Sequence, residues 1–196
     1  PAVFVRLIDQ DGATGIGEIF ANWPAAGAEH RARLLMEDIA DLVLGFEAAA
    51  PGDLYEMLTE RTYVRALQCG EWGPFRHVIA GLDIAIHDLF AKKAGQPLNR
   101  YLNPKAMERV PVYASGIPIR DAGETIPASR DKGFDRFKVK IGFNQLSDIR
   151  GLHDARSGLQ DGERLMADAN QAWTARTAVQ FLQKLGEIDL GWLEEP

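Results

Sequence analysis

The chain opens with two short stretches of strand-forming residues. Residues 2–8 are rich in β-branched and aromatic side chains, and residues 13–19 follow as a second stretch of this kind. Asp11-Gly12 between them is a dipeptide that strongly favours a tight hairpin turn. The sequence therefore predicts a β-hairpin at the start of the chain.

The spacing of apolar residues then lengthens to that of helices. This pattern covers residues 28–44 and 53–66, and residues 76–94 are apolar on most sides. Gly95 ends the last of these stretches, as glycine commonly does after a helix. A helix that is apolar on most sides is normally buried between two layers. We therefore predict that residues 1–108 form a small α+β domain.

After residue 108, short strand patterns alternate with amphipathic stretches. The predicted strands cover residues 110–115, 134–141, 164–169 and 191–194. The amphipathic stretches between the later strands predict helices around residues 146–159 and 178–185. Strands that alternate with helices indicate βαβ units and a parallel sheet. Residues 109–196 are therefore expected to form a second domain, and the fold class is α/β.

Composition narrows the classes of partner. The 196 residues carry a formal net charge of −6, and 46% of them are apolar. No apolar run approaches the roughly 20 residues that a membrane-spanning helix needs. Mild acidity with scattered basic residues argues against binding to nucleic acid or to an anionic membrane. The single Cys69 cannot form an internal disulfide, which favours a cytoplasmic location.

Polar side chains stand at the ends of three predicted strands. Lys138 and Lys140 are two positions apart, so both side chains point to one face of their strand. Asp168 and Asn170 repeat this spacing at the end of the next strand, and Glu194 ends the fourth. The positions recur at about the length of one βα unit, roughly 30 residues. In a (β/α) barrel, this rim of strand ends is where active sites are built.

These residue types suit proton abstraction next to a carboxylate. That reaction forms an enediolate, whose negative charge a cation can neutralise. Carboxylate oxygens such as those of Asp168 and Glu194 are suitable ligands for Mg²⁺. A lysine beside the cation and beside another lysine loses its proton more easily and can act as a base. The second lysine can stay charged and hold the carboxylate of the substrate.

The same segments resemble the enolase superfamily, on its mandelate racemase and muconate lactonizing branch. The resemblance rests on Phe137-Lys-Val-Lys-Ile-Gly142, Met166-Ala-Asp-Ala-Asn-Gln-Ala-Trp173, Trp192-Leu-Glu-Glu-Pro196 and the helix signature from Ala80 to Pro97. It implies an N-terminal α+β capping domain followed by a TIM-like (β/α) barrel, of which about the first four strands are present. Dehydration or racemisation of a sugar acid or hydroxy acid with Mg²⁺ is the implied reaction.

The resemblance also implies a role for each matching residue. Lys140 corresponds to the acid/base lysine, and Lys138 to its partner that contacts the substrate carboxylate. Asp168 and Glu194 correspond to metal ligands, and Asn170 to an asparagine that hydrogen-bonds near the lysines. The region from Phe20 to Trp23, including Asn22, corresponds to a mobile loop that covers the substrate. A small carboxylic acid is the expected partner, and relatives usually assemble as homo-oligomers.

The sequence leaves several other functions and structural interpretations open. The reaction could instead be a muconate-type cycloisomerisation or a dipeptide epimerisation, and lysines at barrel strand ends also serve Schiff-base aldolases. A truncated or degenerate chain without catalysis is a further alternative. The lysine pair could be a solvated strand face, the Glu-Glu-Pro end a plain turn, and Trp23 a packing residue. Pro127 predicts a helix that begins late or is kinked.

A complete barrel of this type needs about 250 residues. We therefore expect the natural chain to begin before Pro1, with one more strand in the capping domain, and to continue beyond Pro196. The third metal ligand and the acid/base group on the opposite face of the substrate are expected in that continuation. The site is thus expected to be complete only in the longer protein.

Overall fold

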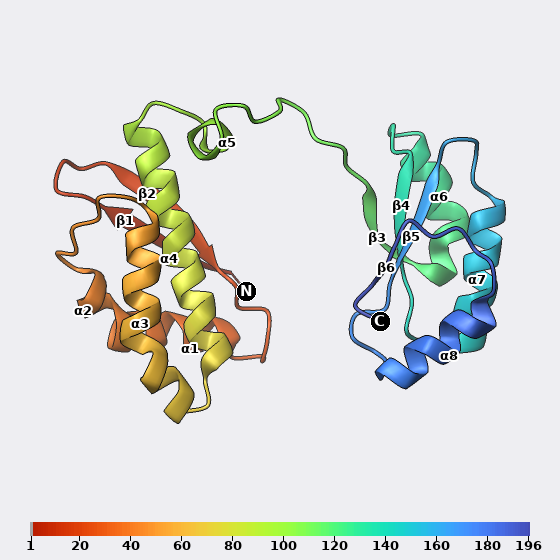
Figure 1. The fold of residues 1–196 in the computed structure, drawn as a ribbon, viewed down its shortest axis with the longest axis horizontal. Coiled ribbons are helices and arrows are strands. Elements are labelled where there is room, and N and C mark those ends of the chain that lie inside the picture. The colour runs from red at the N-terminus through yellow and green to blue at the C-terminus, as the bar shows by residue number, and fades with distance from the viewer. Residues whose placement is uncertain (1) are drawn as a thin grey trace. The chain divides into compact units, whose positions relative to one another are not determined.

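The computed structural model describes residues 2–196 and divides the chain into two compact units (Figure 1). The boundary falls between Met107 and Glu108, one residue before the position expected from the sequence. Each unit has its own core of buried apolar side chains.

The first unit is an antiparallel hairpin packed on helices. Strands β1 (Val3–Ile8) and β2 (Thr14–Ile19) pair antiparallel around the Asp11-Gly12 turn, as the predicted hairpin requires. The helical segments are α1 (Gly27–Leu34), the π-helix η1 (Leu35–Ile39), α2 (Ala40–Val43), α3 (Gly52–Gln68), α4 (Trp72–Lys93) and α5 (Leu98–Leu102). The hairpin and the helices that follow it agree with the α+β domain predicted from the sequence.

The helical pattern predicted over residues 28–44 is confirmed, but the helix is interrupted. A π-helical turn at Leu35–Ile39 separates α1 from α2. Leu34 and Ile39 are both buried in the core of this unit. Residues five positions apart do not share a face of an α-helix, whereas the wider π turn brings them closer to the same face. Burial of both side chains therefore accounts for the interruption.

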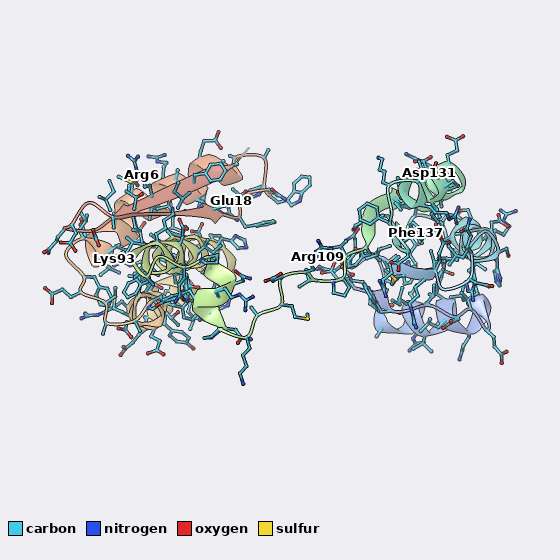
Figure 2. The ribbon with its side chains drawn as sticks, turned by 90° about the horizontal axis from the view of Figure 1, so that it is seen from above. Arg6, Glu18, Lys93, Arg109, Asp131 and Phe137 are labelled. Carbon is cyan, nitrogen blue, oxygen red and sulfur yellow. The ribbon has the colours of Figure 1, made fainter. Side chains whose placement is uncertain are left out.

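Glycines allow the hairpin to lie directly on α4. Gly15 and Gly17 face the helix, and a Cβ atom added to either would overlap the carbonyl oxygen of Ala85 or Gly81. At the far end of the helix, Lys93 reaches the hairpin turn and pairs with Asp9 at 2.5 Å (Figure 2). The close backbone approach thus explains why this strand carries glycine at alternate positions.

The second unit is a parallel four-stranded sheet in the order β3-β4-β5-β6. Its strands are β3 (Ala114–Pro118), β4 (Arg136–Lys140), β5 (Arg164–Asp168) and β6 (Leu193–Glu194). The helices are the 3₁₀ turn η2 (Ile119–Asp121), α6 (Ala122–Arg130), α7 (Gln145–Ser157) and α8 (Ala175–Leu185). Figure 1 shows the three α-helices along one side of the sheet. This strand–helix alternation is the first half of a (β/α) barrel, as predicted.

Three predicted boundaries in this unit need correction. The first strand begins at Ala114 rather than at residue 110, since the side chains of Val110 and Val112 are exposed. The fourth strand is limited to two residues that pair with β5. Helix α6 begins at Ala122 and contains Pro127 in its interior, so the prediction of a late start is wrong. Pro127 has no N–H to donate to the carbonyl of Gly123, so α6 lacks one hydrogen bond in its interior.

Strands β4 and β5 present two different faces. Their helix face carries four side chains that are buried against residues of α6, α7 and α8, namely Phe137, Val139, Leu165 and Ala167. Figure 2 shows Phe137 inside the second unit. The opposite face, called the lysine face below, carries Lys138, Lys140, Met166 and Asp168. Alternation along a strand produces this division.

Helices of the length and apolarity that a membrane span requires do not occur within residues 2–196.

Candidate active site

The polar residues of the lysine face meet across three adjacent strands. Lys138 and Lys140 come from β4, Asp168 is the last residue of β5, and Glu194 is the last residue of β6. The parallel register pairs Lys140 with Asp168, and Asp168 with Glu194. The four side chains that sequence reasoning selected on separate strands therefore lie side by side at one rim of the sheet.

Asp168 is the centre of this group. Its side chain is 1% exposed, and its Oδ2 atom accepts hydrogen bonds from Lys140 Nζ at 2.7 Å and from Lys138 Nζ at 3.1 Å. Lys138 is 6% exposed and donates a second hydrogen bond to Glu194 Oε1 at 2.6 Å. A buried lysine that bridges two carboxylates is not a solvated strand face, so that alternative is wrong.

Asn170 joins the group from the segment that follows β5. Its Oδ1 atom accepts a hydrogen bond from Lys140 Nζ at 2.9 Å, and its backbone N–H donates to Asp168 Oδ1 at 2.9 Å. Asn170 has a φ of 47°, and the next residue, Gln171, has a φ of 61°. Few residues other than glycine adopt this left-handed conformation, and such strain is commonly found at functional sites.

The electrostatic environment keeps the central ion pairs charged. Burial alone favours the neutral form of Asp168, but hydrogen bonds from Lys140, the Asn170 backbone and Lys138 outweigh it and lower the pKa of Asp168 to about 2. Burial likewise opposes the charge of Lys138. Its hydrogen bonds to Glu194 and Asp168 are stronger and hold the pKa of Lys138 above its ordinary range.

The two carboxylates suit a hard divalent cation. Asp168 and Glu194 converge on one positive charge in this structure, the ammonium group of Lys138, at 3.1 and 2.6 Å. Oxygen ligands of this type are the ones that Mg²⁺ prefers. Among residues 2–196, no three His, Cys, Asp or Glu side chains are grouped to hold a metal ion. The chain thus offers two carboxylates of suitable chemistry, and their role as metal ligands stays a prediction, as does a third ligand.

The segment that follows β4 is anchored by one buried carboxylate. Asp148 is 1% exposed, and its Oδ2 atom accepts hydrogen bonds from the backbone N–H groups of Gly142, Phe143 and Asn144 at 2.9 to 3.1 Å. Gly142 has a φ of 99° and lies against Ala169, in the segment that follows β5. The turn after Lys140 is therefore fixed by the Asp148 carboxylate, which holds its backbone N–H groups, and by the close approach of Gly142 to Ala169.

Two aromatic residues near the lysines were missed by sequence reasoning. Trp192 Nε1 donates a hydrogen bond to Glu194 Oε2 at 3.1 Å, and the Trp192 ring packs edge-on against Tyr113 with 5.4 Å between centroids. The Tyr113 ring lies 5.5 Å from Lys138 Nζ. Trp192 is two positions before Glu194, and this spacing on a predicted strand is the signal that could have found it.

The remaining candidates lie elsewhere. Glu195 has a φ of 43°, and its carboxylate accepts a hydrogen bond from Gln171 at 3.2 Å rather than from the lysines. Asn22 and Trp23 belong to the first unit, in the segment after β2. Trp23 is 76% exposed, which contradicts its reading as a packing residue within that unit. A substrate-binding role for Asn22 and Trp23 stays a prediction.

Comparison with known families identifies both units. The pattern of the family described as "Mandelate racemase / muconate lactonizing enzyme, N-terminal domain" matches residues 1–102. The pattern described as "Enolase C-terminal domain-like" matches residues 122–196. The chain belongs to the enolase superfamily, on its mandelate racemase and muconate lactonizing branch. This confirms the resemblance and the architecture of a capping domain followed by part of a barrel.

Curated relatives of this superfamily catalyse several reactions. The chain is 32% identical over 200 residues to L-talarate/galactarate dehydratase of Salmonella typhimurium, covering 99% of the chain and 48% of that protein. It is 31% identical over 199 residues to 3,6-anhydro-alpha-L-galactonate cycloisomerase of Streptomyces coelicolor, covering 99% of the chain and 53% of that protein. The chain therefore spans about half the length of these relatives.

Solved structures show the same fold. A mandelate racemase/muconate lactonizing enzyme from Bordetella bronchiseptica RB50 is 45% identical and superposes with a TM-score of 0.94, covering 100% of this chain and 54% of that one. A racemase from Streptomyces coelicolor A3(2) with bound magnesium is 30% identical, with a TM-score of 0.86, covering 100% of this chain and 58% of that one. Magnesium therefore occurs in the family to which this chain belongs.

Proposed function

We propose that the intact protein containing this chain removes the proton α to a carboxylate, through an enediolate, with Mg²⁺ as cofactor. The observation that carries the proposal is the row of Lys140, Asp168 and Glu194 on three adjacent strands, with Lys138 bridging the two carboxylates. Superfamily membership supports the same reaction class, because its curated relatives include dehydratases, racemases and cycloisomerases. The substrate is a small carboxylic acid.

The two lysines take different parts in this proposal. Lys140 is 28% exposed by side chain and stands at the end of β4, so it is the more accessible of the two lysines and we assign it the proton transfer at the α-carbon. Lys138 is more deeply buried and stays charged, which suits it to hold the substrate carboxylate. Asn170 accepts a hydrogen bond from Lys140 and thereby orients its amine.

Asp168 and Glu194 are the residues that would hold the magnesium ion. When bound there, the ion would supply positive charge that stabilises the carboxylate oxygens as the α-proton leaves. Asp168 is well suited because it remains ionised at all ordinary pH values, given a pKa of about 2. The Glu194 side chain is 35% exposed, so it can change its contact from Lys138 to another cation.

Dehydration of a sugar acid is the preferred overall reaction. Removal of the α-proton and departure of the β-hydroxyl as water gives an enol, which rearranges to a 2-keto acid. This preference rests on the similarity to L-talarate/galactarate dehydratase, and racemisation of a hydroxy acid comes second. We further propose that Asn22 and Trp23 contact the substrate from the capping domain, where the exposed Trp23 ring offers an apolar surface.

Cycloisomerisation is the second candidate function. It is favoured by the 31% identity to 3,6-anhydro-alpha-L-galactonate cycloisomerase, which extends over 99% of the chain. Epimerisation of a dipeptide is a related possibility, since a hydrophobic dipeptide epimerase of Enterococcus faecalis is 31% identical over 118 residues. All of these reactions share the first step, so the assignment of Lys140 does not depend on the choice.

Exchange of the α-proton tests the shared step. The intact protein is incubated with Mg²⁺ in deuterated water and a panel of hydroxy acids and sugar acids, and deuterium at the α-carbon is measured by NMR. Incorporation that Lys140→Ala removes is the expected result. Absence of exchange over the whole panel would overturn the proposal. The products then separate the candidates, because dehydration alone yields a 2-keto acid with loss of water.

Two further alternatives have distinct signatures. A Schiff-base aldolase needs no metal and would be trapped on its lysine by borohydride in the presence of a carbonyl substrate. The two acidic strand ends, Asp168 and Glu194, argue against it, because a Schiff-base mechanism has no use for metal ligands. A non-catalytic protein would bind no Mg²⁺ in its intact form, and calorimetric titration with Mg²⁺ tests this directly.

We also propose that the protein works in the cytoplasm as a homo-oligomer. The single cysteine suits a reducing compartment, and assembly is expected from the family resemblance. Light scattering on the intact protein measures the mass of the assembly. A mass equal to that of one chain would contradict the proposed homo-oligomer. Cell fractionation measures the location.

A further inference from the structure

Both oxygens of the Glu194 carboxylate are held by side chains of its own unit. Lys138 Nζ donates to Oε1 at 2.6 Å, and Trp192 Nε1 donates to Oε2 at 3.1 Å. The two donors differ in kind. An ammonium group is a cation that a metal ion can replace, whereas an indole N–H is a neutral donor that can only hydrogen-bond. The Trp192 contact is therefore the one that can persist beside a bound metal ion.

Glu194 needs an external support more than Asp168 does. Asp168 is 1% exposed and its Oδ1 atom is held by the Asn170 backbone. The Glu194 carboxylate is held by two side-chain donors, Lys138 and Trp192, and its side chain is 35% exposed. A glutamate side chain has one more rotatable bond than an aspartate side chain, so ordering it costs more conformational entropy. A neighbouring donor can lower that cost by selecting one rotamer in advance.

Trp192 is itself fixed in place. It packs edge-on against Tyr113, with an interplanar angle of 76°, and such aromatic pairs are stabilising beyond the area that they bury. The face of Tyr113 in turn lies 5.5 Å from Lys138 Nζ, within the range of a cation–π contact. Tyr113 thus contacts both donors that hold Glu194. The chain Tyr113–Trp192–Glu194 is a continuous set of contacts under the rim.

We propose that Trp192 is a positioning residue for Glu194, and that Tyr113 supports it by fixing the indole plane. This inference rests on the proposed function, because it concerns Glu194 as a metal ligand. The indole holds Oε2, so Oε1 is the oxygen that is left to contact a cation. Residues that orient a metal ligand in this way typically change metal affinity by about ten- to a hundredfold when they are replaced.

Metal affinity of paired tryptophan variants tests the proposal. Mn²⁺ is titrated into the intact protein, and the unbound ion is measured by electron paramagnetic resonance. Trp192→Phe keeps an aromatic ring but removes the N–H donor, and it is expected to weaken Mn²⁺ binding by about tenfold or more. Trp173→Phe is the matched control, because Trp173 packs on Phe181 on the helix side and touches neither carboxylate. It is expected to change the affinity less than twofold.

Glu194→Gln separates this inference from the proposed function. If Glu194→Gln weakens Mn²⁺ binding while Trp192→Phe behaves like the Trp173 control, Glu194 is a ligand but Trp192 does not position it, and the inference is wrong. If neither Glu194→Gln nor Asp168→Asn weakens binding, the proposed metal site itself is wrong. Loss of affinity in Trp192→Phe together with Glu194→Gln supports both.

Tyr113 gives a graded version of the same test. Tyr113→Phe keeps the ring that contacts Trp192 and is expected to leave Mn²⁺ affinity unchanged, because the ring and not the hydroxyl packs on the indole. Tyr113→Leu removes the edge-to-face contact and is expected to weaken binding by about two- to tenfold. An equal effect of the two substitutions would show that the ring does not support Trp192.

A measurement on the metal-free protein covers the case in which Trp192→Phe fails to fold. The indole N–H groups of the four tryptophans are resolved by ¹H–¹⁵N NMR. Glu194→Gln replaces the charged acceptor by a neutral one, so one indole resonance is expected to move upfield while the resonance of Trp173 stays in place. Four unshifted resonances would mean that the Trp192–Glu194 hydrogen bond does not form, and would overturn the proposal.

Discussion

The helix face and the lysine face of β4 and β5 share one backbone but differ in chemistry. On the helix face, Phe137 and Val139 are fully buried among apolar side chains of the helices. On the lysine face, Lys138 and Asp168 are almost as deeply buried, yet both are charged. Burial alone therefore does not distinguish the two faces.

What differs is how each face compensates for burial. Apolar residues gain free energy when they leave water, at roughly 25 cal/mol per Å². Buried charges lose hydration, and only ion pairs and hydrogen bonds of good geometry offset the loss. Lys138 and Asp168 make those contacts with each other and with Lys140 and Glu194. The comparison indicates that the helix face stabilises the fold through apolar burial, while the lysine face is the one that carries the proposed chemistry.

The largest effect is expected from a substitution that alters the lysine face alone. Lys140→Ala should reduce α-proton exchange by at least about a hundredfold, because acid–base groups contribute factors of 10² to 10⁴. Its side chain is 28% exposed, so the fold should tolerate the change. The exchange rate in deuterated water measures the first effect, and Mn²⁺ affinity serves as the control. Unchanged exchange would remove Lys140 from the mechanism.

A substitution in the buried helix face should lower the stability of the fold, in contrast to one at Lys140. Phe137→Ala leaves a cavity at a site that is 0% exposed and should lower the free energy of unfolding by about 3–5 kcal/mol. Denaturant unfolding measures this. Phe143→Ala is the matched control, since Phe143 is 75% exposed and should cost less than about 0.5 kcal/mol. Similar costs at the two positions would contradict the assignment of Phe137 to the core.

A smaller effect is expected where the segments after β4 and β5 meet. Gly142→Ala introduces a Cβ at a φ of 99°, and that atom would lie 2.8 Å from the carbonyl oxygen of Ala169. We expect a loss of about 1–3 kcal/mol in stability together with slower α-proton exchange. Gly162→Ala shares the positive φ but has no atom within 4 Å, so it reports the backbone strain alone. The difference between the two variants measures the close contact.

The smallest expected effect is a pH dependence of stability, and it comes from an ion pair that belongs to neither face. Hydrogen bonds from Arg130 to Glu163, at 2.6 and 2.8 Å, lower the pKa of Glu163 below its ordinary value. The Arg130–Glu163 pair therefore contributes its full stabilisation of the fold above the ordinary glutamate pKa of about 4.3. That contribution is lost as the pH falls through the lowered pKa of Glu163 in the folded protein. The difference in Tm between the wild type and Glu163→Gln should shrink from pH 6 to pH 3. The exposed Glu124→Gln should show no such trend.

Local sequence patterns predicted most of this arrangement. The spacing of Lys138 and Lys140 placed both on one face because side chains alternate along any strand. The hairpin followed from Asp11-Gly12 and the stretches on either side. The prediction was less accurate where the outcome depended on distant packing. The π turn at Leu35–Ile39 and the late start of β3 both depend on which side chains are buried in the folded chain.

The sequence by itself determined which residue types stand at the strand ends, because that depends only on the local period of two. The tertiary structure decided which of them touch. Lys138 and Glu194 are 56 positions apart, and only the parallel register of three strands brings them to 2.6 Å. The link from Tyr113 through Trp192 to Glu194 has the same origin. Contacts between distant segments are set by how strands pair and pack, and local alternation carries no information about that pairing.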